Sequence, residues 1–268
     1  MRSIIFKLLW ISASVLWAFS GAFAQRSDAK VAASGQILAG EVLKYDAKIN
    51  KILRGISIAE LTLSALGTPN STDLVVKAEA VSKGTLLKIF RYSFLQQYES
   101  TMDAGFRVIK TAKHDVQKER IRESEANFDY RRRMVTFVET DPKNASRAPR
   151  RIASEIGDQM LDMVSAIYFI RLQPLAVGKR FDLSISDSGL VYKIPVNVTG
   201  REMQKTIHGN LWCYRVEPDI FGSGRLIEQK GKMVIWFADD ARHTPVRSQI
   251  DTEVGKIDVK LKSAKPVK

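Results

Sequence analysis

The sequence predicts an all-β fold: a strongly curved antiparallel sheet, or half-open barrel, with one helix inserted near its middle. Most of the chain consists of short runs in which apolar and polar residues alternate with a period of two, as in strands with one wet face. Glycines separate many of these runs, and short links between neighbouring strands favour antiparallel meanders. Residues 162–178 differ, because they have the apolar spacing of a buried helix. A curved sheet wrapped around that helix would cover it.

The first 24 residues have the three regions of a secretory signal. Arg2 and Lys7 are positive, residues 8–19 are apolar, and an A-x-A cleavage site ends at Ala24. The apolar run is short for a membrane span, and no cysteine follows it for lipid attachment. The sequence therefore predicts a periplasmic protein that is exported and cleaved after Ala24, with an uncleaved anchor as the alternative.

The basic charge of the chain points to anionic partners. The formal net charge is +13, and the leader holds two of the 42 basic residues and no acidic one, which leaves +11. A basic surface attracts anions. Because the leader predicts export, we expect lipid headgroups or acidic cell-wall polymers rather than nucleic acid. Charge spread over the surface for solubility is the alternative.

The N-terminal part is expected to be a series of strands after a flexible lead-in at residues 25–39. Residues 41–50 alternate clearly, and the apolar parity flips between Ile58 and Leu61, which indicates a β-bulge near Ala59 and Glu60. Further strands are expected at residues 74–81, 86–98 (where a short helix also fits), 106–116, 121–130 and 134–139. The highly charged run 121–130 indicates an edge or solvent-facing strand. Residues 141–151 are expected to form a polar, basic loop.

The central helix is predicted at residues 163–172. Asp162 can cap it, since its carboxylate can accept the free N–H groups of the first turn. Arg171 lies in the last turn, where a cation suits the negative end of the helix dipole. Pro174 cannot continue the helix. Almost every side of the helix is apolar, which indicates burial.

After the helix, the strand pattern resumes. Strands are expected at residues 180–186, 191–199, 205–216, 225–237, 246–252 and 256–262. Residues 263–268 are expected to form a basic tail, so that one β domain spans residues 40–262. The only cysteine, Cys213, lies between Trp212 and Tyr214 and is expected to be a small buried hydrophobe.

Several motifs carry a family resemblance. Gly40-Glu41-x-x-x-Tyr45 opens the strands, and Glu99-Ser100-x-x-Asp103 follows an aromatic strand. The strongest motif is Asp162-x-x-Ser165-Ala166-x-Tyr168-x-x-Arg171-x-x-Pro174-Leu175-x-x-Gly178, and Trp236-x-x-Asp239-Asp240 comes later, with Pro245-Val246-Arg247 and Gly255 beyond it. Over roughly residues 40–262 the chain resembles the exported bacterial family catalogued as domain of unknown function 3108. The resemblance implies an envelope location and an antiparallel β domain similar to the half-open barrels of periplasmic lipid carriers, and it brings no established activity.

Six residues are candidate ligand contacts. Arg171, on an otherwise apolar helix, must reach an acid, carbonyl groups or solvent. A structural ion pair is one interpretation, and an anionic headgroup is the other. Tyr168 and Ile167 lie on the same helix. The remaining candidates, Arg131, Arg132 and Arg133, form either a solvated turn or an anion-binding patch.

Asp239, Asp240 and His243 form the one cluster with catalytic potential, because two carboxylates beside an imidazole can share acid–base work or bind a metal. A turn is the stronger interpretation, since Asp is a common turn residue and consecutive strand side chains point to opposite faces. The sequence has no GxSxG, P-loop or HExxH motif. We therefore expect no catalytic residues, no metal and no cofactor.

These observations favour a non-enzymatic periplasmic binding or carrier protein for an amphipathic envelope molecule, such as a lipid or acyl chain, with peripheral contact to the membrane. The alternative is an envelope interaction or structural protein that contacts anionic cell-wall polymer or a partner protein through its surface.

Overall fold

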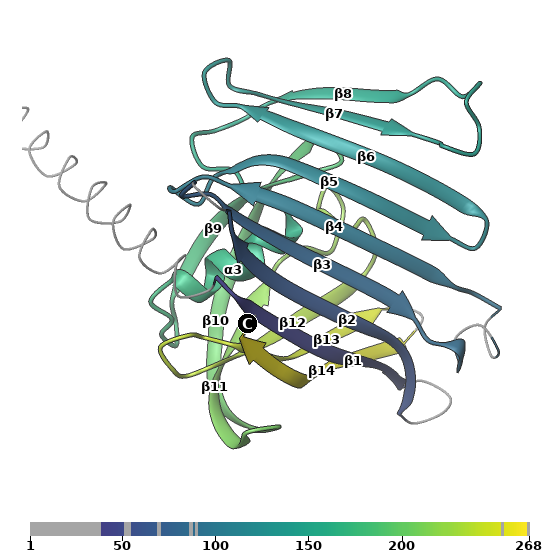
Figure 1. The fold of residues 1–268 in the computed structure, drawn as a ribbon. Coiled ribbons are helices and arrows are strands. Elements are labelled where there is room, and N and C mark those ends of the chain that lie inside the picture. The colour runs from purple at the N-terminus through teal and green to yellow at the C-terminus, as the bar shows by residue number, and fades with distance from the viewer. Residues whose placement is uncertain are drawn as a thin grey trace, which may run out of the picture.

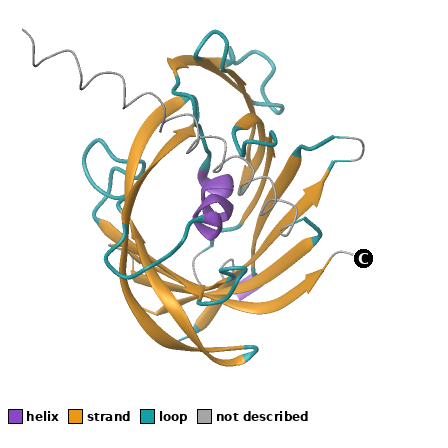
Figure 2. Ribbon diagram, turned by 90° about the vertical axis from the view of Figure 1, so that its left-hand side faces the viewer, coloured by secondary structure: helices purple, strands orange, loops and turns teal. Residues whose placement is uncertain are grey.

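The computed structural model describes residues 39–50, 55–68, 71–85, 88, 91–252 and 255–266. The expected signal at residues 1–24, and the lead-in apart from Ala39, lie outside these ranges. The described chain forms a single antiparallel sheet of 14 strands that curves around the helix α3 (Met163–Leu172), which confirms the predicted fold class (Figure 1). Figure 2 shows the helix inside the curve of the strands. In the part of the chain that is described, no helix is long and apolar enough to cross a membrane.

The strands follow one another as a meander in each half of the chain. The first half contains β1 (Glu41–Asn50), β2 (Ile56–Gly67), β3 (Leu74–Ser82), β4 (Phe94–Met102), β5 (Val108–Gln117), β6 (Arg120–Asp129), β7 (Met134–Thr140) and β8 (Arg150–Glu155). The second half contains β9 (Arg180–Asp187), β10 (Leu190–Thr206), β11 (Gly209–Pro218), β12 (Gly231–Ala238), β13 (Pro245–Thr252) and β14 (Gly255–Pro266).

The first and last strands lie side by side in the middle of the sheet. The strand order is β8-β7-β6-β5-β4-β3-β2-β1-β14-β13-β12-β11-β10-β9, and β1 pairs with β14 from Glu41 opposite Pro266 to Asn50 opposite Lys256. The basic tail was predicted to begin at Ser263. This prediction is wrong, because residues 263–266 continue β14 along β1. The expected bulge is present, since the β1–β2 register shifts between Ala47 and Lys48, opposite Ala59 and Ser57.

Two other strand predictions need correction, and a third is confirmed in one of its two forms. The charged strand β6 is not an edge, because it lies between β5 and β7, but it is the solvent-facing strand that the sequence offered as the other possibility. Its acids face outward and pair across the sheet, as Lys110 and Glu125 do at 2.6 Å. The expected strand at residues 86–98 begins only at Phe94, and residues 84, 85 and 88 are helical. The expected strand at residues 225–237 begins only at Gly231, because residues 222–230 form turns and an isolated bridge.

The strand β8 replaces the end of the loop expected at residues 141–151. Its sequence gives little sign of a strand, since Arg150 and Arg151 begin it with two exposed cations and only Ile152 is a large apolar residue. The strand forms because Ile152 pairs with Phe137 of β7 and packs on its inner face.

The two ends of the curved sheet contact each other, because the turn at one end lies against the face of the strands at the other. The β9–β10 turn reaches the inner face of β7 and β8, where Gly189 has a φ of +80°. A Cβ atom at Gly189 would lie 2.6 Å from Cβ of Phe137 and 3.0 Å from Cβ of Ile152, so only glycine fits this close approach.

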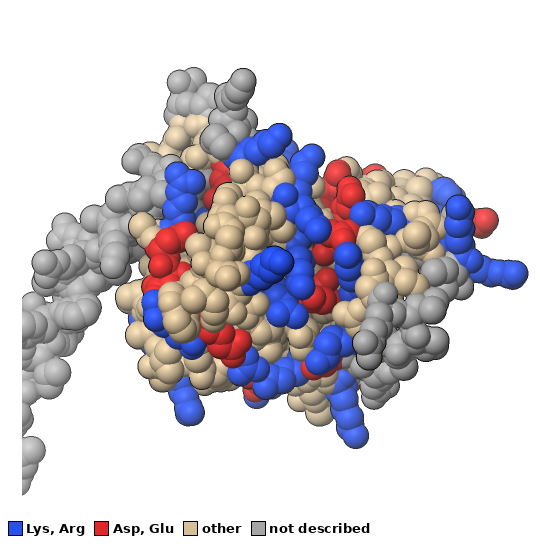
Figure 3. All heavy atoms as spheres, turned by 90° about the horizontal axis from the view of Figure 1, so that it is seen from below, with Lys and Arg blue, Asp and Glu red and all other residues tan. Residues whose placement is uncertain are grey.

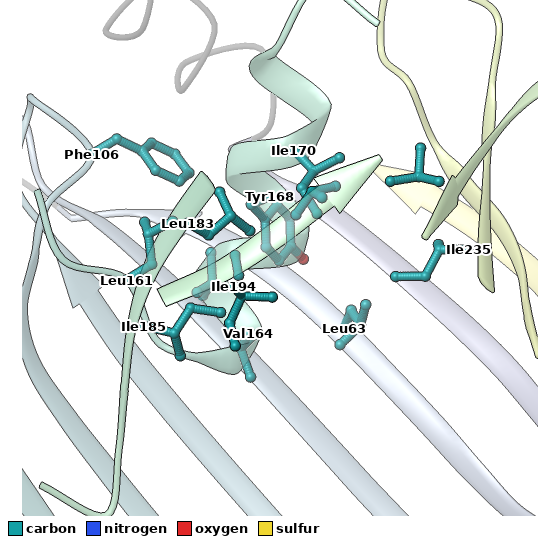
Figure 4. Close-up of a cluster of buried hydrophobic side chains, with 14 of the residues drawn as sticks. Leu63, Phe106, Leu161, Val164, Tyr168, Ile170, Leu183, Ile185, Ile194 and Ile235 are labelled. Atoms are coloured by element: carbon teal, nitrogen blue, oxygen red, sulfur yellow. The ribbon is translucent and has the colours of Figure 1, made fainter. Parts of the chain in front are cut away.

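The helix fills the inner side of this curve. One continuous apolar core includes Val164, Tyr168 and Ile170 of α3 together with side chains from both halves of the sheet (Figure 4). Tyr168 is fully buried, and Leu43, Val76 and Ile194 on the surrounding strands are too. The predicted helix bounds, 163–172, are confirmed.

Candidate functional site

The start of α3 is anchored by a buried acid. Asp162 accepts hydrogen bonds from the backbone N–H groups of Val164 (2.7 Å) and Ser165 (2.9 Å), and Ser165 Oγ accepts from the Asp162 N–H at 2.8 Å. This reciprocal capping box confirms the predicted cap. The hydroxyl of Ser100, on β4, also donates to the Asp162 carboxylate. Burial raises the pKa of Asp162, although these donors act in the opposite direction.

The end of α3 is anchored by a buried ion pair. The Arg171 side chain has no exposed surface, and its Nη1 and Nη2 atoms lie 2.5 and 3.0 Å from the two carboxylate oxygens of Glu41 on β1. Its Nε donates to the carbonyl of Arg242 at 3.1 Å, and its guanidinium lies 5.3 Å from the centre of the Tyr168 ring. The structure therefore has the structural ion pair rather than a guanidinium open to a headgroup.

The six candidate ligand contacts do not meet in one place. Tyr168 is buried beside Arg171, burial raises the pKa of its hydroxyl, and this hydroxyl has no hydrogen-bond partner among the described residues. Ile167 is partly buried against the core. The other three, Arg131, Arg132 and Arg133, are exposed in the β6–β7 turn, and β2 to β5 separate this turn from the strand that carries Glu41. The Asp129 carboxylate accepts the N–H groups of Arg131 and Arg132, as in a solvated turn.

Asp239, Asp240 and His243 are each engaged elsewhere. The Asp239 carboxylate accepts from Arg201 at 2.7 Å, which holds the pKa of Asp239 below its usual value. Asp240 accepts the N–H of Arg242, and Nδ1 of His243 lies 2.9 Å from the carbonyl oxygen of Arg171. The described residues contain no group of three potential metal ligands. The three side chains thus belong to a turn against the end of α3.

Family motifs that are distant in the sequence converge around a small cleft beside the buried ion pair. Its volume is about 270 Å³. Its lining combines acids, bases and apolar side chains: Ala39, Gly40, Glu41, His208, Leu211, Ala238, Asp240, Arg242, Thr244, Val246, Ala264 and Lys265. We call this the rim cleft. Sequence reasoning missed Glu41, His208 and Lys265 as neighbours, although Glu41 and Asp240 both belong to the family motifs.

The β10–β11 hairpin borders the rim cleft and extends beyond the sheet. β9 pairs with β10 only up to Asn197, and β12 pairs with β11 only from Cys213 to Val216. From the Met203–Trp212 pair to the turn, the strand pairing joins only β10 and β11. The hairpin is held to the rest of the sheet here by the Asp239 N–H, which donates to the Trp212 carbonyl at 2.8 Å, and by Arg247 of β13, which donates to Gln204 at 3.2 Å. In Figure 1 this hairpin is the lowest part of the molecule.

The hairpin carries large exposed apolar side chains. Met203 and Trp212 lie directly opposite each other, so they share one face, and they are 48% and 47% exposed. Ile207, in the turn, is 43% exposed. The guanidinium of Arg201 lies 4.6 Å from the centre of the Trp212 ring. We call Met203, Ile207 and Trp212 the hairpin tip.

A larger hollow, of about 640 Å³, lies on the outer face of β3 to β7. The charged side chains that line it pair with one another or with neighbours, as Lys77 does with Glu99 at 2.6 Å and Glu125 with Lys110 at 2.6 Å. Figure 3 shows a similar mixture on the lower face, where acidic side chains lie between the basic ones. These surfaces therefore carry both positive and negative side chains.

Comparison with solved structures identifies a protein with the same fold. The chain has the fold of a crystallised β-barrel-like protein of domain of unknown function DUF1849 from Brucella abortus, with a TM-score of 0.60 and 10% identity over 86% of this chain and 99% of that one. A putative exported protein with a YmcC-like fold from Bacteroides fragilis matches at a TM-score of 0.31 and 12% identity, covering 85% of this chain and 96% of its own. A hypothetical protein from Chlamydia trachomatis matches at 0.32 and 10%, covering 88% and 92%.

The chain belongs to the family described as "Protein of unknown function (DUF3108)", whose match covers residues 44–262. This confirms the family resemblance seen in the sequence motifs. No functionally curated protein matches the chain. The descriptions of the family and of the barrel-like Brucella protein name no activity.

Proposed function

We propose that the protein is an exported, non-enzymatic binding protein of the cell envelope that contacts anionic, amphipathic lipids at the membrane surface through the β10–β11 hairpin. The observation that carries the proposal is the exposed pair of Met203 and Trp212 on a hairpin that extends beyond the sheet. The expected export comes from the leader at residues 1–24.

The packing around α3 favours contact at the surface over a ligand inside the curve. Val164, Tyr168 and Ile170 already occupy the inner side of the sheet as part of the continuous core. Arg171, which would have met the headgroup of an enclosed lipid, is satisfied by Glu41 and by the carbonyl of Arg242. Opening this site to a ligand would expose a buried charge pair, which is costly.

The hairpin tip has the chemistry of an interfacial anchor. Tryptophan is enriched where membrane and water meet, because its ring is amphipathic and its bulk is apolar. Clustered exposed apolar side chains on a soluble surface mark interaction sites. Lys205 shares the face of Met203 on β10, since strand residues two apart point the same way. Arg201, which pairs with Asp239, stacks on Trp212 of β11. An apolar tip with a flanking lysine suits anionic headgroups.

The rim cleft would hold part of a lipid next to the hairpin. Leu211, Val246 and Ala264 supply apolar contacts, and Arg242 and Lys265 supply cations. The cleft is slightly smaller than the roughly 300 Å³ at which drug-sized ligand pockets begin. It therefore fits a headgroup or the end of a chain rather than a whole lipid.

Sedimentation with vesicles tests the proposal. The exported protein is mixed with vesicles of phosphatidylglycerol and phosphatidylethanolamine, or of phosphatidylcholine alone, and the bound fraction is measured after centrifugation. We expect binding to the anionic vesicles and about thirtyfold weaker binding for M203S/W212S, because each of the two lost apolar contacts contributes on the order of 1 kcal/mol.

The matched control is V81S/M134S, which removes two side chains of similar exposure, 39% and 41%, from β3 and β7. It should bind as the wild type does. No binding to either vesicle, or equal loss in both double variants, would refute the proposal. Binding to a soluble anionic polymer but not to vesicles would support the alternative of a cell-wall contact.

A further inference from the structure

We infer that the free edge of β8 is a self-association site, at which a second copy of this chain adds its own β8 antiparallel to the first. The register is centred on Ala153, so that Arg151 of each copy lies opposite Glu155 of the other. The two curved sheets would then join into one.

The two ends of the sheet differ in how their edges are covered. At β9, the Leu161 N–H donates to the Ser184 carbonyl at 2.9 Å, and the Ser186 N–H donates to the Leu161 carbonyl at 2.8 Å. In the described chain, β8 has only β7 as a strand neighbour, and Figure 1 shows it at the top of the molecule with no strand above it. The segment after β8 turns into the core, since Ile156 and Met160 are buried.

The backbone of β8 presents a regular set of outward groups. The Ile156 N–H donates to the Arg133 carbonyl of the neighbouring hairpin at 3.0 Å. Antiparallel ladders alternate, so Ser154 and Ile152 direct their backbone groups to β7 as well. Arg151, Ala153 and Glu155 therefore direct their N–H and C=O groups away from the sheet. The side chains of these three residues are also exposed.

Symmetry selects the register of the pairing. A two-fold axis perpendicular to the sheet brings residues from the same face opposite each other. A centre at Ala153 engages all three residues with outward groups, Arg151, Ala153 and Glu155, whereas a centre at Ile152 or Ser154 would engage only two of them. It places a small side chain at the axis and gives two Arg151–Glu155 pairs of opposite charge, which stabilise directly opposed strands.

Self-pairing would use the charges of this edge. Natural edge strands carry charged residues, prolines or bulges that hinder pairing with other chains. β8 has the sequence RRIASE, without proline, and pairs with β7 without a register shift, and its charges at Arg151 and Glu155 are opposite in sign and would face each other in the dimer. Arg150 does not block the edge, because its guanidinium lies over the Phe137 ring, 5.9 Å from the ring centre. From the inner side, the β9–β10 turn supports β8 at Gly189.

Charge exchange tests the register. The protein is purified from the envelope of a host that expresses the full sequence, and its mass is measured by analytical ultracentrifugation across concentrations. We expect a dimer, and an increase in dissociation constant on the order of tenfold for R151E or E155R alone, because each creates two like-charge pairs. An equimolar mixture of the two variants, and the double variant R151E/E155R, should both recover the wild-type affinity.

Cysteine cross-linking tests the geometry independently. Directly opposed, hydrogen-bonded residues have Cα atoms about 5.5 Å apart, which a disulfide can span. A153C should form a covalent dimer on mild oxidation, whereas S154C should not, since its symmetry mate is displaced along the strand. The native Cys213 is buried and does not interfere. The inference would be overturned if the protein were a monomer at all concentrations or if the dimer did not cross-link through A153C. It would also be overturned if the mixture of R151E and E155R stayed dissociated.

Discussion

Arg171 and Glu41 lie 130 positions apart in the chain and form a two-point ion pair whose guanidinium is completely enclosed. The pair joins the end of α3 to the first strand, which itself lies beside the last strand. Through the carbonyl of Arg242, Arg171 also holds the turn after β12. This contact therefore connects the helix to the middle of the sheet, where the two halves of the chain meet.

Glu41→Gln should destabilise the protein strongly. The substitution leaves the Arg171 charge buried without a counter-charge, which costs about 3–5 kcal/mol. Urea unfolding measures the free energy of unfolding. The double variant E41L/R171M, which removes both charges, should be much more stable than the single one. Equal losses in the single and double variants would show that the ion pair does not determine the effect.

Asp162 should give the protein a characteristic pH dependence. Its pKa in the folded state is raised above 3.8, so the folded protein keeps this proton to a higher pH than the unfolded chain. The stability that this group contributes is complete below about pH 3.8 and is lost as the pH rises through the folded-state pKa. Between pH 3.5 and 7, the free energy of unfolding of the wild type should therefore fall relative to that of D162N as the pH rises. A constant difference would contradict the expected titration.

The local features of the fold were predictable, and the long-range contacts were not. The limits of α3 follow from Asp162 and Pro174, which act on neighbouring backbone groups. The pairing of β1 with β14, and of Glu41 with Arg171, depends on how the chain returns, which alternation along a strand does not record. The sequence offered both interpretations of Arg171 but not its partner. The β8 strand was missed because its side chains are mostly polar.

Gly189→Ala should test the closure of the curved sheet. The new Cβ would collide with Phe137 and Ile152, in addition to the strain of a φ of +80°. Gly209→Ala is a matched control, since Gly209 has a φ of +89° and a Cβ added there would meet no atom within 4 Å. We expect G209A to cost about 1 kcal/mol and G189A to cost about 1–3 kcal/mol more. Similar unfolding free energies for the two variants would argue against the close approach.

Cys213 should be unreactive in the folded protein. Burial, together with Asp240 and Asp239, raises the pKa of its thiol from 9.0 to about 11. At pH 8 the thiolate fraction is then roughly a hundredfold smaller than for a free thiol. Steric protection of the buried thiol acts in the same direction on the reaction rate. Alkylation by iodoacetamide, followed by mass spectrometry, should be slow in buffer and fast in urea. Equal rates in the two conditions would contradict the buried position of Cys213.

The central claim is that the hairpin tip enters the membrane interface, and tryptophan fluorescence tests it most directly. Beyond the expected leader, the chain has two tryptophans, the exposed Trp212 and the buried Trp236. On addition of phosphatidylglycerol vesicles to the protein without its expected leader, we predict a blue shift of the emission and quenching by brominated lipid. Both responses should be absent in W212F, whose remaining tryptophan is Trp236. An unchanged emission in the wild type, or an equal response in W212F, would contradict the claim.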